Sequence, residues 1–370
     1  MDEQRQFAFQ EFGDHFIGYP CNLGYDYSAV FKTLEFHFNN VGDPYVQGLY
    51  KTNSKEEERR VLKFFQELWN FDDSNVWGYI THNGTEGNMQ GLYVGREMFP
   101  DGILYCSEDS HYSIFKIANI LKLKTEIIKS QENGEMCYQD FEKKLEKNKE
   151  LPAIICVNIG TTMKGAIDNA REIYRIICKH NVHERYYMHA DGALMGFMLP
   201  FLETDIFFKR NIHSISVSGH KFLGTPFPCG IFMMEKRFLD IISKNIEYIG
   251  TADNTISGSR NGHSAVFLDY ILKQKGKNGL RDDILNCIDT SEYALTKLNC
   301  IQHRAWRNSN SITVVFDRPA ESIVTKWQLA VQKNVAHIIT MPHVTKIKID
   351  HFVNDMTRHN KTTGLKKNFQ

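Results

Sequence analysis

The sequence lacks several features that would place it in a simple class. Its 44 basic and 44 acidic side chains cancel, so no excess charge marks a surface for nucleic acid or anionic membrane. No apolar run approaches the roughly 20 residues that a membrane-spanning helix needs. The beginning, MDEQRQFAFQEF, is polar and acidic, unlike a signal peptide. Internal repeats and low-complexity segments are absent. We therefore expect neither nucleic acid nor membrane as a partner.

Cysteine pairs with metal-binding or redox spacing are also missing. The eight cysteines are scattered, with no CxxC and no zinc spacing, and several lie in apolar segments, such as Cys156 in AIICVN. This usage predicts buried, reduced thiols, no metal site and a cytoplasmic location. An apolar fraction of 42%, with 12% aromatic residues, is sufficient for a large core.

What the sequence does contain is a regular alternation of short apolar segments with helical ones. The predicted strands are VWGYIT, GILYCS, TEIIK, PAIICVN, RYYMHA, IHSISVS and CGIFMM, between Val76 and Met234. Helical patterns at 89–99, 114–121, 141–148 and 171–180 separate several of them. Such alternation predicts an α/β fold whose mostly parallel central sheet carries helices on both faces.

The composition divides the chain into four predicted parts. They are an aromatic N-terminal arm (1–53), a large α/β domain (54–260), linking helices with a small α+β C-terminal domain (261–356), and a flexible basic tail (357–370). Ser54 precedes Glu57 by three residues, the spacing of a capping box, and therefore predicts the start of the first helix of the large domain.

One group of small and polar residues follows the first predicted strand. Ligands of open α/β sheets bind beyond the carboxyl ends of the strands. In the segment NGTEGN, Gly84 would let the backbone approach a ligand, and Thr85 would add a hydroxyl at a helix start that attracts anions. The same segment would also fit an ordinary N-cap made by Asn83 or Thr85, and one segment can serve both purposes.

Three reactive side chains follow other predicted strands. His111, in SEDSHYS, is either an ordinary hydrogen-bonded loop histidine or a planar ring that stacks on a flat ligand. Asp191, in HADGA, either caps a turn or holds a proton on the ring nitrogen of a ligand, and the small Gly192 and Ala193 leave space beside it. Lys221, in SVSGHKF, brings an amine to a strand end among Gly, Phe and Pro.

Together these residues match the needs of one cofactor. A phosphate cradle, a stacking ring, an acid for a pyridine nitrogen and a lysine amine are the components of a pyridoxal 5′-phosphate (PLP) site. No single motif decides this, but the order of phosphate turn, His, Asp and Lys at successive strand ends favours PLP.

Four motifs carry a family resemblance. The segments NGTEGNMQGLYVGREMFPDGILYCSEDSHYS, NIGTTMKGAID, HADGALMGFMLPF and SVSGHKFLGTPFPCGI resemble the group II PLP-dependent amino-acid decarboxylases of fold type I. The resemblance runs from about Tyr19 to Ile347. It is strongest to the bacterial PLP-dependent histidine decarboxylases, and plant serine decarboxylases carry closely related motifs.

The resemblance implies a role for each motif residue. Lys221 would carry the cofactor as the internal aldimine, His111 would stack on the ring, Asp191 would pair with the pyridine nitrogen, and Ala193 would pack on the opposite face. The phosphate would be held by Asn83, Gly84, Thr85, Ser218 and His220, and Thr161 or Thr162 would lie near the ring hydroxyl. Gly192 departs from the alanine of many relatives without removing a functional group.

The resemblance also implies a homodimer with shared active sites. Tyr19, Pro20 and Asn22 would shape the substrate pocket, and Ser257, Ser259 and Arg260 would bind phosphate or the substrate carboxylate. An ordinary interface salt bridge is an equally good interpretation of Arg260. Tyr248 is our first choice as the proton donor to Cα, ahead of Lys221 and His111. It would otherwise be a packing tyrosine.

The predicted reaction is decarboxylation of L-histidine to histamine and CO2, through an external aldimine and a quinonoid. Serine or another small amino acid is the alternative substrate. A cysteine desulfurase would need an accessible loop cysteine, whereas Cys287 and Cys300 fall in a helical pattern. An aminotransferase would bind the substrate carboxylate with an arginine near the C-terminus, and Arg304 and Arg307 are candidates for that role. A PLP-fold scaffold without activity would not require Lys221, His111 and Asp191 to be present together.

Overall fold

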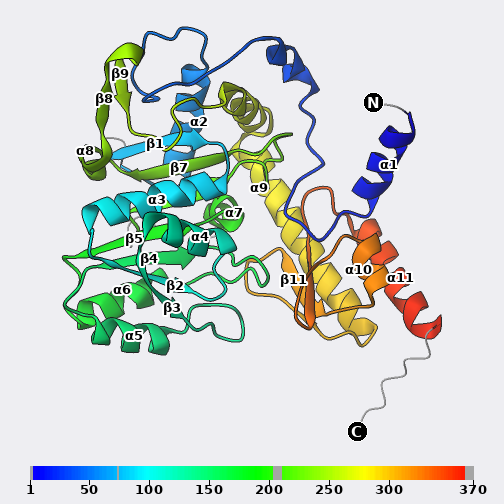
Figure 1. Cartoon of the computed structure of the whole chain (residues 1–370). Helices are drawn as coiled ribbons and strands as arrows, with labels where there is room; N and C mark the ends of the chain where they lie inside the picture. Colours follow the sequence, from blue (N-terminus) through cyan, green and yellow to red (C-terminus); the bar gives the residue numbers. More distant parts are fainter. Residues whose placement is uncertain (1–2, 73–74, 203–210, 363–370) are drawn as a thin grey trace. The chain divides into compact units, whose positions relative to one another are not determined.

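The computed structural model describes residues 3–72, 75–202 and 211–362 (Figure 1). The chain forms two compact units. The large unit comprises Tyr25–Thr162 and Ala166–Leu280, and the small unit comprises Met1–Gly24, Met163–Gly165 and Arg281–Gln370.

A seven-stranded sheet forms the centre of the large unit. Its strands are β1 (Val76–Thr81), β2 (Ile103–Ser107), β3 (Lys124–Ile128), β4 (Ala153–Asn158), β5 (Tyr186–Asp191), β6 (Ser214–Ser218) and β7 (Gly230–Glu235). The order is β1-β7-β6-β5-β4-β2-β3, and β7 runs antiparallel to both of its neighbours while the pairs from β6 to β3 are parallel. The predicted mostly parallel sheet is confirmed.

Helices pack on both faces of this sheet, as the alternating pattern predicts. They are α2 (Lys55–Leu68), α3 (Gly84–Met98), α4 (Tyr112–Leu121), α5 (Tyr138–Lys147), α6 (Ala170–Lys179), α7 (Met195–Leu202) and α8 (Leu239–Ile242). Strand β6 shows why both faces are covered. Its serines turn toward α3, whereas Ile215 and Val217 lie against Gly192 and Gly196 on the side of α7.

Four glycines of α3 let this helix lie unusually close to the sheet. We call Gly84, Gly87, Gly91 and Gly95 the glycine stripe; their spacing of three or four residues places them on one helix face. A Cβ atom on Gly87 would lie 2.2 Å from Ser216 Oγ, and one on Gly91 would lie 2.2 Å from a ring nitrogen of a buried histidine on β5. Side chains larger than hydrogen would therefore push α3 away from β5 and β6.

The start of α2 corrects one prediction. Ser54 is buried, and its side chain makes no capping hydrogen bond; its hydroxyl instead donates to the Gly262 carbonyl, 2.6 Å away. Glu57 pairs with Arg60 at 2.9 Å. The predicted capping box is wrong, because a tertiary hydrogen bond to a distant segment takes the serine hydroxyl.

The predicted N-terminal arm is divided between the two units. Residues 25–53, with the 3-10 helix η1 (Ser28–Glu35), belong to the large unit, because Tyr27 donates to the Leu223 carbonyl and Asp43 accepts from Trp77 and Asn254. The boundary after the large domain also differs from the predicted 260. Helix α9 (Gly262–Cys300) contributes its first part, to Leu280, to the large unit and bends at Gly276, whose φ is 61°.

The large unit also contains a short hairpin that the sequence pattern did not predict. It consists of β8 (Lys244–Ile246) and β9 (Thr251–Asp253), which pair antiparallel. The one-turn helix η4 (Glu247–Ile249) joins them, preceded in the chain by η3 (Lys236–Phe238) and α8.

The small unit is a four-stranded antiparallel sheet with helices. The sheet order is β10-β11-β13-β12, formed by Ala305–Trp306, Thr313–Asp317, Val335–Ile339 and Ala330–Gln332. The helices are α1 (Glu3–Asp14), the remainder of α9, α10 (Glu321–Lys326) and α11 (Lys346–Thr362). Helix α10 stops at Lys326, since Gln328 adopts a left-handed φ of 50°.

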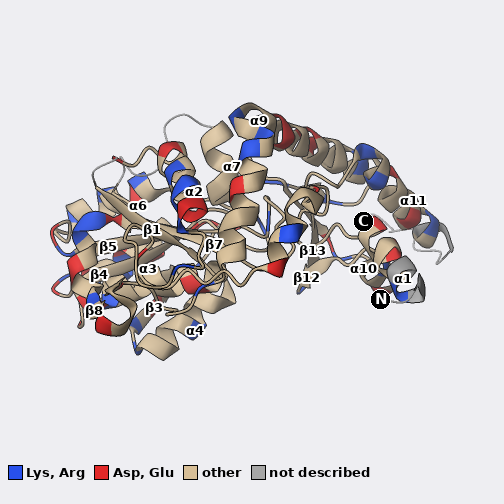
Figure 2. Cartoon of the chain, turned by 90° about the horizontal axis from the view of Figure 1, so that it is seen from above, with Lys and Arg blue, Asp and Glu red and all other residues tan. Residues whose placement is uncertain are grey.

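The surface carries charges of both signs (Figure 2), and the described helices are not long apolar segments. Basic and acidic residues alternate along α9 and α11 (Figure 2). Among the described helices, none combines the length and apolar character required to cross a membrane. Helix α11 continues to Thr362, so it includes the beginning of the predicted tail; the remainder, 363–370, lies outside the described residues.

Candidate active site

The N-terminus of α3 forms one end of the candidate site. Asn83 caps the helix, since its side-chain oxygen accepts a hydrogen bond from the Glu86 amide at 3.0 Å. A Cβ atom on Gly84 would lie 2.6 Å from Ser218 Oγ, at the end of β6. The Ser218 amide donates to the Ala193 carbonyl at 3.0 Å. The predicted cap is confirmed, and the absent side chain at Gly84 leaves backbone amides and a serine hydroxyl facing the same place.

Glu86 fixes the conformation of this helix start. One carboxylate oxygen accepts from both the amide and the ring Nδ1 of His82, each at 2.8 Å, and the other accepts from Tyr79 Oη at 3.2 Å. The hydrogen bond to Glu86 raises the pKa of His82 above its ordinary value. Burial alone would raise the pKa of Glu86, but the contacts with His82 and Tyr79 lower it overall. The sequence analysis gave this glutamate no such role.

Asp191 lies buried at the end of β5. Its Oδ2 accepts from the Asn88 side-chain amide at 2.9 Å, and its Oδ1 accepts from the Ala193 backbone amide at 3.2 Å. The second contact is the turn-capping bond that the sequence pattern predicts as one possibility. Gly192 packs on α7, where an added Cβ would lie 3.0 Å from Gly196 Cα. The carboxylate is therefore held from two sides.

His111 caps α4 and is close to both other reactive groups. Its Nδ1 accepts from Ser113, 2.7 Å from the hydroxyl and 3.3 Å from the amide, so the ring proton is on Nε2. Burial lowers the pKa of His111; the nearby Asp191 opposes this effect, and Lys221 adds to it. The structure thus brings His111, Asp191 and Lys221 into one electrostatic neighbourhood.

Lys221 is half-buried in the turn after β6, between two anchored neighbours. The His220 Nδ1 lies 2.9 Å from the Cys229 carbonyl oxygen, and burial lowers the pKa of this histidine. On the other side Phe222 is buried against Phe197, with ring centroids 5.4 Å apart. These contacts fix the backbone that carries the lysine.

The two threonines of NIGTT, Thr161 and Thr162, differ in solvent exposure. Thr161 is buried, and its hydroxyl oxygen accepts from the Ala166 amide at 3.0 Å, whereas Thr162 is exposed.

Next to His111, Ser110 Oγ is buried and has no hydrogen-bond partner among the described residues. This hydroxyl is a site feature that the sequence analysis missed.

Arg260 occupies a buried ion pair within the large unit. Its guanidinium pairs with Glu58, and both side chains are at most 1% exposed. It also donates to the Gly42 carbonyl at 3.0 Å, while Glu58 accepts from the Ile80 amide at 2.9 Å. The charge of Arg260 is already neutralised, so this geometry favours the salt-bridge interpretation over a carboxylate clamp, although the pair lies inside one chain.

The other predicted substrate residues have contacts of their own. Ser259 Oγ accepts from Asn39 at 3.1 Å, and Ser257 is half-buried in the same loop. Tyr248 is 83% exposed on η4, the turn of the β8–β9 hairpin. Tyr19, Pro20 and Asn22 belong to the small unit, where Tyr19 stacks on Phe16. Their roles stay predictions.

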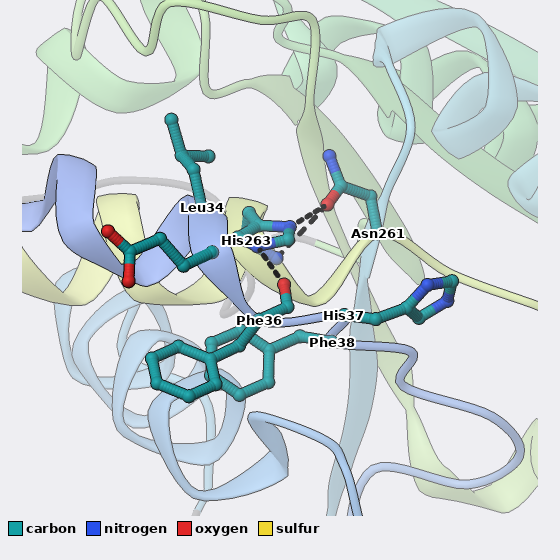
Figure 3. A pocket seen from close by; sticks show the side chains of 7 residues that line it. Leu34, Phe36, His37, Phe38, Asn261 and His263 are labelled. Carbon is teal, nitrogen blue, oxygen red and sulfur yellow. Dashed lines mark hydrogen bonds between the residues drawn. The ribbon is translucent and has the colours of Figure 1, made fainter.

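A surface hollow of about 440 Å³ lies elsewhere in the large unit (Figure 3). It is lined by Leu34, Glu35, Phe36, His37, Phe38, Asn261 and His263. His263 Nε2 lies 2.9 Å from the Phe36 carbonyl oxygen, which ties the arm to the start of α9. The hollow contains none of the predicted site residues.

Known proteins resemble the chain over almost its whole length. The family described as "Pyridoxal-dependent decarboxylase conserved domain" matches residues 93–316. Serine decarboxylase 1 of Oryza sativa subsp. japonica is 43% identical, with 94% of this chain and 73% of that protein covered. Histidine decarboxylase of Acinetobacter baumannii (strain ACICU) is also 43% identical, covering 92% and 90%. The structure of L-methionine decarboxylase from Streptomyces sp. 590 superposes with a TM-score of 0.87 at 22% identity, covering 97% and 96%.

Proposed function

We propose that this chain, which belongs to the pyridoxal-dependent decarboxylase family, converts L-histidine to histamine and CO2. PLP is its cofactor, and amino-acid decarboxylation is its reaction class. The fold is that of the fold type I decarboxylases. The site assignment is supported by the hydrogen bond from Asn88 of α3 to Asp191 and by the action of the Asp191 and Lys221 charges on His111.

The residues present fit PLP. The space kept open at Gly84 against Ser218 suits a phosphate at a helix N-terminus, and the buried Ser110 hydroxyl offers a donor that the described residues leave unused. Asn83, Thr85 and His220 complete the proposed phosphate site, and Thr161, rather than the exposed Thr162, suits a contact near the ring. When bound, PLP supplies the electron sink that lets the substrate carboxylate leave as CO2.

The residues of the chain then act by holding the cofactor in place and by holding or moving protons. Asp191 would keep a proton on the ring nitrogen, since its carboxylate is fixed by two donors. Lys221 would attach the cofactor through its amine and leave when the substrate amine replaces it. His111, its Nδ1 engaged by Ser113, would present a fixed neutral ring to one face of the cofactor, with Ala193 on the other.

The choice of histidine rests on the extent of the match. The match to this chain spans 90% of the length of the bacterial histidine decarboxylase and 73% of the length of the plant serine decarboxylase, and both are 43% identical to it. Serine is therefore the second candidate. Incubation of the purified holoenzyme with each of the twenty amino acids, with CO2 and amine measured, separates the two. Release of CO2 from serine instead of histidine would transfer the assignment to serine.

A Gly84→Ala substitution should weaken PLP binding. The new Cβ would lie 2.6 Å from Ser218 Oγ, and overpacking of this kind costs about 1–3 kcal/mol. We expect the dissociation constant of PLP from the apoenzyme to rise roughly 10- to 100-fold, measured by fluorescence titration. Gly102→Ala is the matched control, because its Cβ would lie 2.9 Å from the Phe99 carbonyl oxygen, beyond the far end of the same helix. Equal loss of PLP affinity in both variants would refute a phosphate cradle at Gly84.

Tyr248→Phe should separate cofactor binding from turnover. If Tyr248 donates the proton to Cα, amine production should fall by about 10²- to 10⁴-fold, with the visible absorption of bound PLP unchanged. Near-normal turnover would exclude Tyr248 as the donor.

The exposure of Tyr248 is compatible with a role in a second copy of the chain. A homodimer is supported by other apolar side chains left exposed in the large unit, among them Phe31, Leu34, Phe36 and Leu49, at 50%, 52%, 58% and 66%. If sites are shared, mixing Tyr248→Phe with a variant that lacks Lys221 should restore part of the activity. The cytoplasmic location expected from the cysteine usage stays a prediction.

A further inference from the structure

We infer that Asn88, His189 and Ser214, with Tyr187 at the outer end, act as positioning residues that hold the Asp191 carboxylate in a fixed orientation. We call these four side chains the polar chain. The inference rests on the proposed pairing of Asp191 with the ring nitrogen of PLP, and it adds residues to which the sequence analysis gave no role.

The polar chain is continuous from α3 through β5 to β6. Asn88 Nδ2 lies 2.9 Å from Asp191 Oδ2, and Asn88 Oδ1 lies 3.0 Å from His189 Nε2. His189 Nδ1 lies 2.8 Å from Ser214 Oγ, to which Tyr187 donates at 2.7 Å. All four side chains are at most 2% exposed, so no water competes for these hydrogen bonds.

The chemistry of the groups fixes the direction of every bond. An ionised carboxylate only accepts, so the NH2 group of Asn88 faces Asp191 and its carbonyl oxygen faces His189. The His189 Nε2 must therefore donate. Burial lowers the pKa of His189 to about 3, so the ring is neutral and its Nδ1 accepts from the Ser214 hydroxyl. Every donor, from Tyr187 inward, points toward Asp191.

The packing of α3 shows that space is reserved for this arrangement. A Cβ atom on Gly91 would lie 2.2 Å from His189 Nδ1 and 2.5 Å from its Cε1. A side chain there would displace the imidazole from both of its partners. Burying a polar side chain without a hydrogen-bond partner costs folding free energy. Asn88, His189 and Ser214 avoid this cost because each has a partner on both sides, and the Tyr187 hydroxyl closes the series.

The functional consequence concerns the ring nitrogen of the cofactor. Hydrogen bonds donated to a carboxylate favour its ionised form, and only an ionised carboxylate holds a proton on a neighbouring pyridine nitrogen. Loss of the Asn88 donor leaves Oδ2 without its side-chain partner. Loss of the His189 ring frees the Asn88 amide to rotate. Both changes should reduce the protonated fraction of the ring nitrogen and the affinity for PLP.

The test uses the holoenzyme loaded with ¹⁵N-labelled PLP. We expect Asn88→Ala and His189→Leu to move the ring-nitrogen signal toward the unprotonated position and to weaken PLP binding to the apoenzyme. The expected loss is roughly 10- to 100-fold, the effect of removing outer hydrogen-bond partners at metal sites. His189→Gln places an amide nitrogen near the position of Nε2 and should restore most of the signal. Tyr187→Phe should have a smaller effect than Asn88→Ala.

His213 provides a matched control. It is buried, its pKa is also lowered by burial to about 3, and it accepts from the Met188 amide at 2.9 Å. Within the described residues it makes no hydrogen bond to the polar chain, and its ring stacks on that of Tyr187 with centroids 5.3 Å apart, a contact that a phenylalanine ring can keep. His213→Phe should reduce the free energy of unfolding without moving the ring-nitrogen signal. If Asn88→Ala and His189→Leu behave like His213→Phe, the inference is wrong and the polar chain is only structural.

The inference and the proposed function fail differently. If Asp191→Asn moves the ring-nitrogen signal while the polar-chain variants do not, the pairing of Asp191 with the cofactor stands and the inference falls. If Asp191→Asn leaves the signal unchanged, the proposed pairing itself is wrong, and the inference falls with it.

Discussion

Replacing Lys221 with alanine should abolish amine production, with a loss of more than about 10³-fold. The amine of Lys221 is the group that would hold the cofactor covalently and release it to the substrate, and no neighbouring residue can repeat both steps. The visible absorption of the enzyme should shift to that of non-covalently held PLP. Borohydride reduction of the wild-type enzyme should fix the cofactor irreversibly on the peptide that contains Lys221, as mass spectrometry can verify.

Lys116 is the matched control for this prediction. It is an exposed lysine of α4 whose charge also reaches His111, and its ammonium lies 5.3 Å from the centroid of the Tyr112 ring. Lys116→Ala should keep both the absorption and the turnover. Fixation of the cofactor on a lysine other than Lys221 would overturn the site assignment as a whole.

Replacing Arg260 with alanine should reduce the stability of the large unit more than any surface substitution. The change leaves the Glu58 carboxylate buried and without its ionic partner, which typically costs about 3–5 kcal/mol. In a folding unit of about 150–250 residues, close to the size of the large unit, each kcal/mol lowers Tm by about 2–4 °C, so the Tm of this unit should fall by roughly 10 °C. Urea unfolding and calorimetry of the apoenzyme measure both quantities.

An exposed ion pair gives the control for Arg260. Lys277 pairs with Glu67 at 3.0 Å, with 54% and 47% of the side chains exposed, so Lys277→Ala should cost no more than about 1 kcal/mol. A substrate-clamp role of Arg260 predicts the opposite result from ours, namely a raised KM with unchanged unfolding.

The sheet was predictable because its strands are short, apolar and bounded by turns. Each of the seven predicted segments overlaps a strand between Val76 and Glu235. Features that depend on tertiary contacts were not predictable. The Ser54 hydroxyl turns to Gly262 and not to its own helix, and α7 is apolar throughout, without the periodicity of an amphipathic helix. Likewise, the left-handed backbone conformation of Gln328 ends α10 early, although the residue pattern of this segment favours a longer helix.

At the candidate site, the reactive side chains were proposed from the sequence, but the residues that hold them were not. Lys221, Asp191 and His111 stand out because charged or titratable residues at strand ends are unusual. Asn88 and His189 lie in the same motifs, yet a buried asparagine and histidine give no local signal of their partner. One signal was available: the serines of SISVS alternate with period two, as do residues on one face of a strand. The segment NGTEGNMQG has three glycines on one helix face, of which Gly84 and Gly87 lie against Ser218 and Ser216.

A last consequence follows from the glycine stripe. The same helix carries the proposed phosphate contact at Gly84 and, about 6 Å farther along its axis at 1.5 Å per residue, the Asn88 amide that holds Asp191. Because side chains of β5 and β6 fill the space beside the glycine stripe, α3 has no room to slide or rotate and change that spacing. We expect this fixed spacing to suit the proposed contacts of PLP, so loading should proceed with little change in heat capacity beyond that of the buried ring itself.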